Sequence, residues 1–245
     1  MTLEACADIV RRGDPDRFRA AMAAPPAARG VLFPIYALNV EAARAPYVTT
    51  EPLIAEMRLQ WWRDALAEIA AGETARRHEV ATPLGALLDA EGCALLDGVV
   101  AARRWDVAGD RFEDADALLA HLDALAGGLM WAAARALGAT DEAACRALGV
   151  AGGLAGWLAA VPAFVARDRA PLPDDGDAAI AALARRGLAL VGPVSRLARP
   201  AALAAWEAVP VLRRAAAEPA RVREGRLTRA PAVRQARLLR MALLG

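Results

Sequence analysis

The chain contains no lysine, and this absence excludes several kinds of enzyme chemistry. A Walker A phosphate loop, a Schiff-base enzyme and a pyridoxal phosphate anchor each require a lysine amine. The single serine, Ser195, lies in the segment VGPVSRLARP, which lacks the Gly-x-Ser-x-Gly pattern of a nucleophile elbow. The sequence also has no Gly-x-Gly-x-x-Gly pattern, so it does not predict a dinucleotide-binding fold.

Cysteine is scarce as well. Cys6, Cys93 and Cys145 are odd in number and far apart, which fits neither a disulfide framework nor a zinc site. We expect them to be buried free thiols in a reducing compartment. The N-terminal segment MTLEACADIVRRGDPDRF is acidic early and has no apolar run, so it is not predicted to be a secretory signal. The expected location is therefore the cytoplasm.

Aromatic residues and alternating β-branched residues are also few, with only two tyrosines and four phenylalanines. Alanine, leucine and arginine dominate instead, and these residues favour helices. The sequence therefore predicts an all-α fold. No Gly/Ser-rich linker or low-complexity run divides the 245 residues, so we expect one domain over residues 1–245.

The segment from Val31 to Ile69 predicts two helices joined by a short Pro/Thr turn. The first helix is apolar almost all round, which is typical of a helix buried on most sides. Pro46 is expected to end it, and Pro34 to kink it unless that proline falls in the first turn. Asn39 is the only uncharged polar side chain in its apolar middle, and a buried amide needs hydrogen-bond partners.

The second of these helices opens at Thr49-Thr50-Glu51-Pro52, where side-chain oxygens are expected to accept the free N–H groups of the first turn. The helical period predicts a stripe that faces the core: Ala55, Leu59, Trp62, Leu66 and Ile69, with Ile54, Met57, Trp61 and Ala65 beside it. An outward set is expected to face solvent, a cavity or a partner: Glu56, Gln60, Arg63 and Asp64.

Residues 147–166 carry no charge, which meets the length criterion of about 20 residues for a membrane span. Alanine and glycine make up most of the segment, so its transfer into lipid is only weakly favourable. The pairs Gly149/Gly153 and Gly152/Gly156 allow another helix to approach closely. We therefore expect a buried helix rather than a span.

Two acidic clusters are expected to be helix caps. Asp110 and Asp114 stand four apart, which suggests a metal site, but carboxylates at a helix start commonly accept free N–H groups. The run Asp174-Asp175-Gly176-Asp177 likewise predicts a turn followed by a cap. We favour the structural interpretation in both cases.

Charge is distributed unevenly along the chain. Residues 211–245 contain nine arginines and two glutamates, a net charge of +7, and form a basic C-terminal helical segment. The ridge formed by Arg234, Arg237 and Arg240 either contacts an anionic membrane surface or an acidic partner, or packs on the acidic body of its own domain. Nucleic acid is not predicted as a partner, because no aromatic-interleaved basic patch accompanies the charge.

Two segments resemble the squalene/phytoene synthase family of all-α isoprenoid enzymes. The first runs from Arg29 to Ile69 and contains YALNVEAAR followed by EPLIAEMRLQWWRDALAEI, and the second is LAGWLAAVPAFVARDRAPLP at residues 154–173. The likeness covers most of residues 14–200. It implies a single-domain helical bundle of the isoprenoid (trans-prenyl) synthase type.

Active members of that family condense two prenyl diphosphates head to head, and two aspartate-rich motifs hold Mg²⁺ across a helical cavity. Hard oxygen ligands are needed because the departing diphosphate builds up negative charge. In this chain the resemblance places other residues at the acidic positions of the first motif: Ala43, Arg44 and Tyr47. The second motif is replaced as well. Gly156 stands at the position of its asparagine and Ala159 at that of its arginine, and Ala160 and Phe164 stand at those of its two aspartates.

The resemblance therefore implies a pocket without catalytic residues or a metal site. Its candidate lining is Tyr36, Asn39, Ala43, Tyr47, Gly153, Gly156, Ala160, Phe164 and Arg169. Asp64 and Glu68 are the nearest substitute carboxylates, but they lack an opposite pair and are expected to lie on a solvated face. No cofactor is expected, and Mg²⁺ is expected only if the chain is an active enzyme.

Asn39-Val40-Glu41, RLQWWRDALAEI and the Val161-Pro162 step more closely resemble an offshoot of the family, the complex I assembly factor 6 type. That type is synthase-like and is associated with the mitochondrial inner membrane. The resemblance implies an accessory role in building NADH:ubiquinone oxidoreductase, with a complex I subunit or assembly factor as partner. The arginine-rich, lysine-free composition and the lack of a transit peptide indicate a bacterial relative at the cytoplasmic face of the membrane.

Three functional hypotheses remain open from the sequence. The first is a non-catalytic protein that acts in complex assembly or binds at the membrane periphery. The second is an active prenyltransferase, which rests on the fold alone. The third is a carrier that holds a lipid or isoprenoid in the cavity and needs no chemistry.

Overall fold

The computed structural model describes residues 3–244, and helices are the only regular elements among them, so the predicted all-α fold is confirmed. Thr2, where the first helix was expected to begin, and Gly245 lie outside the described residues. In chain order the elements are α1 (Leu3–Gly13), α2 (Pro15–Ala23), α3 (Pro26–Arg44), η1 (Ala45–Tyr47), α4 (Pro52–Ala70), α5 (Ala81–Leu87), α6 (Ala90–Ala102), α7 (Arg104–Ala108), α8 (Ala115–Leu122), η2 (Asp123–Gly127), α9 (Gly128–Ala136), α10 (Glu142–Val165), α11 (Asp177–Ala189), α12 (Arg199–Ala202), η3 (Leu203–Ala205), α13 (Ala208–Ala217), α14 (Ala220–Arg223) and α15 (Pro231–Leu244).

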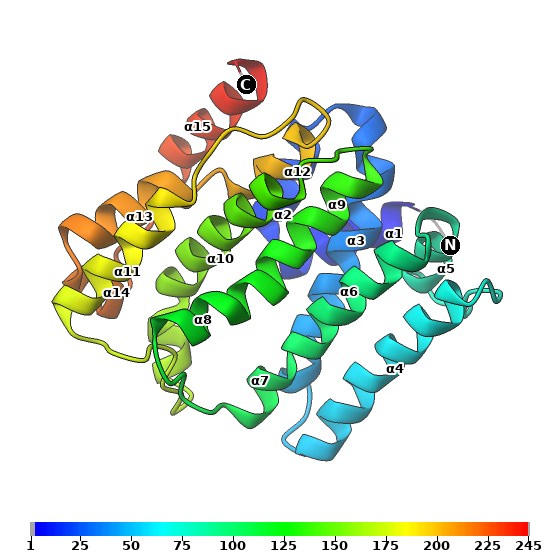
Figure 1. Ribbon diagram of the computed structural model, residues 1–245, viewed down its shortest axis with the longest axis horizontal. Coiled ribbons are helices and arrows are strands. Elements are labelled where there is room, and N and C mark those ends of the chain that lie inside the picture. The colour runs from blue at the N-terminus through cyan, green and yellow to red at the C-terminus, as the bar shows by residue number, and fades with distance from the viewer. Residues whose placement is uncertain (1–2, 245) are drawn as a thin grey trace.

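The helices pack side by side in a bundle (Figure 1). Helices α4 and α6 form one flank, α8 and α9 run through the middle, and α10 separates them from α11 and α13 on the other flank. Helix α15 lies at the edge of the bundle, where it contacts α2 and η3. Helix α10 therefore packs against helices on both of its sides.

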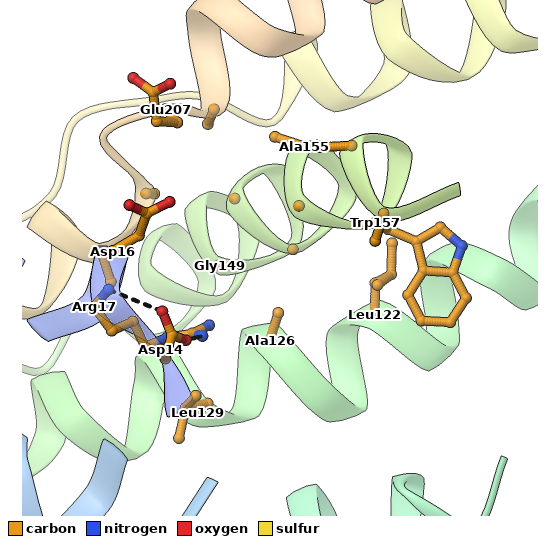
Figure 2. Close-up of a pocket in the computed structure, with 18 of the residues that line it drawn as sticks. Asp14, Asp16, Arg17, Leu122, Ala126, Leu129, Gly149, Ala155, Trp157 and Glu207 are labelled. Atoms are coloured by element: carbon orange, nitrogen blue, oxygen red, sulfur yellow. Dashed lines mark hydrogen bonds and ion pairs between the residues drawn. The ribbon is translucent and has the colours of Figure 1, made fainter. Parts of the chain in front are cut away.

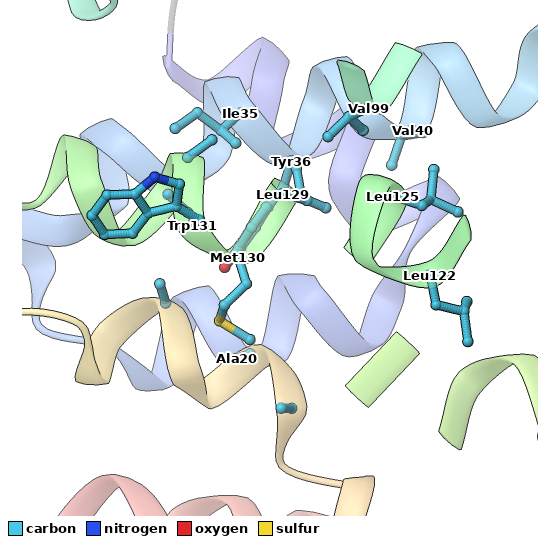
Figure 3. Close-up of a cluster of buried hydrophobic side chains, with 14 of the residues drawn as sticks. Ala20, Ile35, Tyr36, Val40, Val99, Leu122, Leu125, Leu129, Met130 and Trp131 are labelled. Atoms are coloured by element: carbon cyan, nitrogen blue, oxygen red, sulfur yellow. The ribbon is translucent and has the colours of Figure 1, made fainter. Parts of the chain in front are cut away.

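The core is centred on α3, as its apolar sequence predicts. Ile35 and Tyr36 are buried and face Leu129 and Met130 of α9 (Figure 3). Pro34 lies inside α3, yet the helix continues to Arg44. The proline leaves the carbonyl of Gly30 without its helical donor, and because Gly30 is exposed, that carbonyl can be hydrated.

Helix starts follow the predicted chemistry at some positions and depart from it at others. Asp14 caps α2 by accepting a 3.0 Å hydrogen bond from the Arg17 backbone N–H, and Asp114 caps α8 through Ala117 at 2.8 Å. The capping expected for α4 is wrong, because no side chain caps that helix. The Thr49 hydroxyl instead accepts the N–H of Glu51, before the helix begins.

The core-facing stripe predicted for α4 is buried from Ala55 to Ile69. The expectation that Ile54 and Met57 lie beside the core is wrong, because 45% and 63% of these two residues is exposed. Helix α4 is at the outer edge of the bundle (Figure 1), so no helix covers that side. The helical period identified the buried stripe of α4 correctly, but it could not show whether other helices also cover Ile54 and Met57.

Several element boundaries also differ from the expected ones. The sequence predicts helices over residues 93–107, 113–137, 141–166 and 177–198. The first breaks between α6 and α7, and the second is interrupted by the π-helical turn η2. The helix expected over residues 177–198 ends at Ala189. The segment that follows is held by Ser195, whose hydroxyl and backbone N–H donate to Asp141 at 2.6 and 2.7 Å. The short helix α14 was not predicted.

The glycines of α10 allow a close helix contact, as expected. A Cβ atom at Gly149 would lie 2.6 Å from the carbonyl oxygen of Ala126, and one at Gly153 would lie 2.5 Å from the Ala126 Cβ. The backbones of α10 and η2 are therefore in direct contact. The three cysteines are buried free thiols, also as expected.

Two helical stretches are long and apolar enough to cross a membrane by length and composition alone, Ala115–Ala136 and Glu142–Val165. The fold buries 67% of the most apolar window in the first and 50% in the second. Core helices of soluble proteins pass the same test, so this finding is weak evidence for a span.

Candidate functional site

A cavity of about 330 Å³ lies between α10, α3 and the η2–α9 segment (Figure 2). Its size falls at the lower end of the range for small-molecule sites in proteins. The small-residue face of α10 forms one wall, and Leu122, Ala126 and Leu129 face it from the opposite side. Most of this wall area is apolar, so the cavity suits a hydrocarbon group.

The α10 wall has room because its residues are small. Gly152, Gly156 and Ala160 line the cavity at helical spacing. A Cβ atom at Gly156 would meet no atom within 4 Å, so this glycine borders open space. The resemblance places the family's asparagine and one of its aspartates at Gly156 and Ala160, and here neither residue has a side-chain oxygen.

A polar cluster forms the wall contributed by α2 and α3. The Arg17 guanidinium donates to the Asp14 carboxylate at 2.5 Å. Burial alone would raise the pKa of Asp14, but the charge of Arg17 and the hydrogen bonds from its backbone and side chain outweigh burial and lower it. Arg103 donates to the Asn39 amide oxygen at 3.1 Å, which places a second arginine in the same wall.

Arg103, which lines the cavity, connects it to a group of contacts around helix α7. Asp106, 6% exposed, accepts hydrogen bonds from Arg103 and from the Tyr47 hydroxyl, both at 3.3 Å. Arg169 donates to the backbone carbonyl of Asp106 at 3.1 Å. Gly109 has a φ of +73°, and a Cβ atom there would overlap the Arg169 guanidinium. We refer to Tyr47, Arg103, Asp106 and Arg169 as the α7 latch.

Aromatic rings pack beside the latch. The ring centroids of Trp157 and Phe164, which both line the cavity, are 4.7 Å apart, and Trp105 packs against Trp157 at 5.0 Å. The Trp157 indole N–H donates to the carbonyl of Pro171 at 2.9 Å, which fixes the ring. His121 joins this cluster, and burial lowers its pKa to about 4.

A second group of charges lies at the opposite end, where Asp16 and Glu207 line the cavity (Figure 2). Arg234 of α15 donates to both carboxylates, at 2.5 Å to Asp16 and 2.9 Å to Glu207. Its guanidinium also lies 5.0 Å from the ring centroid of Trp206. The C-terminal helix therefore supplies part of the cavity lining.

The structure brings together six of the nine candidate pocket residues, which all line this cavity: Tyr36, Asn39, Gly153, Gly156, Ala160 and Phe164. Ala43, Tyr47 and Arg169 are not among the lining residues. Tyr47 is 47% exposed, and its hydroxyl donates to Asp106, whose backbone carbonyl accepts from Arg169.

Sequence reasoning missed the charged lining residues Asp14, Arg17, Arg103 and Arg234. Asp14 followed by Pro15 does predict a helix start, but its ion pair with Arg17 was not expected. The contact between Arg103 and Asn39 spans 64 residues of sequence, so no local pattern could reveal it.

The outward set of α4 is engaged by neighbouring helices. Arg104 of α7 donates to Glu56 at 3.0 Å and to Gln60 at 3.3 Å. Arg63 donates twice to Asp97 of α6, at 2.7 and 3.0 Å, and Gln60 donates to Asp64 at 2.7 Å. Gln60 and Asp64 are exposed and Glu56 and Arg63 are half-buried, so the set lies at the surface beside α6 and α7, and its use by a partner stays a prediction.

The basic ridge of α15 is also partly engaged. Arg234 is held by Asp16 and Glu207, and Arg237 donates to the Trp206 carbonyl at 3.0 Å. Arg240 is exposed and has no hydrogen-bond or ion-pair partner among residues 3–244. The structure thus favours packing of α15 on the body for two of the three arginines.

The donor set at the cavity does not fit a Mg²⁺–diphosphate site. Among residues 3–244 no group of three or more Asp, Glu, His or Cys side chains is arranged to hold a metal ion. The carboxylates that line the cavity are Asp14, Asp16 and Glu207, and each is bound to an arginine. Hard cations need several free oxygen ligands.

Comparison with known proteins establishes the family. The family model described as squalene/phytoene synthase matches residues 10–179, more than half of the chain. The chain belongs to the squalene/phytoene synthase family. No curated protein matches it, and the subtype expected from the sequence, the complex I assembly factor 6 type, is therefore not established by these comparisons.

Solved structures of this family share the fold. A dehydrosqualene synthase in complex with ligand matches with a TM-score of 0.78 and 14% identity, over 99% of this chain and 95% of that one. The squalene synthase HpnC from Alicyclobacillus acidocaldarius matches with a TM-score of 0.68 and 18% identity, over 91% of this chain and 94% of that one. At such identities the likeness concerns the fold alone, and the isoprenoid synthase fold is confirmed.

Proposed function

We propose that this protein is a non-catalytic member of the squalene/phytoene synthase family that binds a lipid or isoprenoid in its cavity. The observation that carries the proposal is the combination of an open apolar wall at Gly156 and Ala160 with cavity carboxylates that are all bound to arginines. The space for a chain is retained, whereas free oxygen ligands for a metal are missing.

The lack of free oxygen ligands matters because of the way in which prenyl diphosphates ionise. The reaction places growing negative charge on the leaving diphosphate, and that charge must be neutralised in the transition state. Here Arg17 already neutralises Asp14, and Arg103 already neutralises Asp106. Tyr47 and Phe164, which the resemblance places at positions of metal ligands, have no carboxylate, and Tyr47 is bound to Asp106 in the α7 latch.

The competing hypothesis, an active prenyltransferase, is tested directly. Purified protein is incubated with Mg²⁺ and farnesyl or geranylgeranyl diphosphate, and pyrophosphate release is followed over time. We expect release no faster than in buffer. Steady turnover that scales with protein concentration would establish the enzymatic alternative and overturn the proposal.

A role in respiratory complex I assembly is a second candidate. It is favoured by the YALNVEAAR and RLQWWRDALAEI segments, which resemble the complex I assembly factor 6 type. A complex I subunit or assembly factor would be the partner, and the polar face of α4 at Glu56, Gln60, Arg63 and Asp64 is the surface to test. We expect deletion of the gene to lower the amount of assembled complex I on native gels. Unchanged levels in the deletion strain would reject this role.

Peripheral membrane contact is a third element of the proposal, at the cytoplasmic face expected from the sequence. Of the ridge formed by Arg234, Arg237 and Arg240, only Arg240 is free to meet lipid headgroups, and Leu239 and Leu243 beside it are 54% and 82% exposed. Co-sedimentation with anionic vesicles, compared with neutral ones, tests this contact. Arg240→Glu should lower the bound fraction, and equal binding to both vesicle types would exclude an electrostatic contact.

A further inference from the structure

The charges that line the cavity cancel one another. The lining contains three arginines, Arg17, Arg103 and Arg234, and three carboxylates, Asp14, Asp16 and Glu207. Arg17 is bound to Asp14, and Arg234 is bound to the other two carboxylates. Arg103 is bound to Asp106 just outside the lining. Each arginine of the lining therefore has a carboxylate that matches its charge, although the Nε–H of Arg103 has no hydrogen-bond partner.

Two uncharged hydrogen-bond donors in the wall formed by α3, the Tyr36 hydroxyl and the Asn39 amide nitrogen, have no acceptor in the described part of the chain. Tyr36 and Asn39 stand three residues apart on α3, so their side chains lie on one face of the helix, and both line the cavity. The Tyr36 hydroxyl makes no hydrogen bond within residues 3–244, although the residue is only 2% exposed. Its nearest cation is the Arg17 guanidinium, 5.9 Å from its ring centroid.

The amide of Asn39 completes the pair of donors. Arg103 can only donate, so its 3.1 Å contact with Oδ1 turns the amide nitrogen away from the guanidinium. That nitrogen has no hydrogen-bond acceptor in the described part of the chain. Both donors line the cavity, so a ligand oxygen at this point would give them the hydrogen-bond acceptor that the described residues do not supply.

We infer that the cavity takes an uncharged ligand, an apolar chain that ends in a neutral acceptor oxygen such as an alcohol or a carbonyl, and rejects the diphosphate with the same chain. The inference rests on the proposed lipid-binding function. The ligand oxygen accepts from Tyr36 and Asn39, and the chain lies along Gly152, Gly156 and Ala160.

The volume of the cavity agrees with this ligand class. At about 330 Å³ the cavity lies at the lower end of the range for small-molecule sites, which suits an isoprenoid or fatty chain with a small head group. A diphosphate would have to separate Arg17 from Asp14, and the carboxylate left behind would lie in the wall without its cation. This pair is partly buried, so separating it costs free energy that an uncharged head group does not require.

The test compares two ligands that share one chain and differ in their heads. Farnesol and farnesyl diphosphate are titrated into the purified full-length protein with EDTA present, and bound ligand is measured by native mass spectrometry. We expect farnesol to bind at least tenfold more tightly than the diphosphate. Tighter binding of the diphosphate would overturn this inference while leaving lipid binding in place. If neither ligand binds, the proposed function itself fails.

The two tyrosines of the chain provide a matched pair of variants. Tyr36→Phe removes a hydroxyl that has no partner in the protein, so the midpoint of thermal unfolding should not fall, whereas farnesol affinity should fall about two- to tenfold. Tyr47→Phe makes the same change outside the cavity lining and should leave farnesol affinity within about twofold. Equal affinity of the Tyr36→Phe variant and the unchanged protein would reject Tyr36 as the head-group donor.

Discussion

His121 is surrounded by aromatic rings, and this environment sets its protonation state. Its ring centroid lies 5.2 Å from that of Phe112, 5.6 Å from Trp157 and 5.7 Å from Trp105. Burial lowers the pKa of His121 from 6.5 to about 4, with a smaller raising effect from Asp106 and a lowering effect from Arg103. The neutral imidazole is therefore the form that fits the fold near neutral pH.

This pKa predicts how His121 affects stability. The unfolded chain binds a proton at this histidine below about pH 6.5, whereas the folded protein does so only near pH 4, so the free energy of unfolding falls between those values as pH falls. The loss attributable to His121 reaches up to about 3 kcal/mol. Urea unfolding from pH 7 to pH 4 should be less pH-dependent for His121→Phe. An unchanged slope would show that the histidine is protonated equally in both states.

The glycines of α10 and α6 predict opposite effects of one substitution. Gly149→Ala would place a methyl group 2.6 Å from a backbone carbonyl oxygen and should cost about 1–3 kcal/mol, because backbone cannot move aside easily. Gly98→Ala in α6 meets no atom within 4 Å and should stabilise by about 0.5–1 kcal/mol through higher helix propensity. Chemical unfolding of both variants measures the difference. A neutral Gly149→Ala would mean that the α10–η2 contact is looser than the structure indicates.

Residue-level prediction from sequence was successful where the cause was local. Asp14 and Asp114 were recognised as caps because a cap depends on neighbours three residues away. The pairing of Arg103 with Asn39, which gives the cavity its polar wall, joins α3 to the start of α7. Such pairs depend on how helices meet in space, so one sequence could not identify them.

Among the elements, α15 depends most on a single side chain for its position. Leu238 is the buried residue of this helix, and Arg234 supplies its ion pairs with Asp16 and Glu207. The pKa of Arg234 is raised, since its two carboxylate partners outweigh a burial effect that would lower it. The contacts that hold α15 to the rest of the bundle are thus made mainly by Arg234 and Leu238.

Two arginine variants test this attachment. Arg234→Ala should destabilise the protein by about 1–3 kcal/mol and speed amide hydrogen exchange in α15, because Glu207 loses its cation and Asp16 keeps only Arg19. Arg240→Ala removes a charge that has no partner in the described chain and should change stability by less than about 0.5 kcal/mol. Equal exchange in the two variants would show that apolar packing alone holds the helix.

Elements were predicted well where their periodicity was long, and less well at their ends. The apolar side of α4 and the full length of α10 followed from residue spacing. The break at η2 and the exposed side chains of Ile54 and Met57 depend on neighbouring helices. A pattern of spacing shows which side is apolar, whereas the arrangement of helices decides which part of that side is covered.

At the scale of the whole molecule, α10 connects the two flanks of the bundle. Leu154 is buried where α10, α11 and α13 meet, and a Cβ atom at Gly187 would lie 2.7 Å from it and 3.1 Å from Leu212. The opposite side of α10 packs on η2 and α9. Loss of either flank would expose the same central helix to water.

This arrangement predicts that residues 1–245 unfold in a single transition, as one domain would. The six tryptophans are distributed from Trp61 in α4 to Trp206 beside α13, so their fluorescence reports on both flanks. Midpoints of urea unfolding followed by tryptophan fluorescence and by far-ultraviolet circular dichroism should coincide. Two separate midpoints would indicate that the C-terminal helices form an independent unit.

The α7 latch bears on the proposed non-catalytic function, because it sets the order in which metal ligands could be introduced. Substituting aspartate at Ala43, Ala160 and Phe164 would supply oxygen ligands but would leave Asp106 bound to Arg103 and Arg169. Aspartate at Tyr47 would bring a second carboxylate toward Asp106, and like charges at that distance repel. Under the proposed function, a route to catalysis would therefore have to release the latch as well as add the ligands, which takes several changes together.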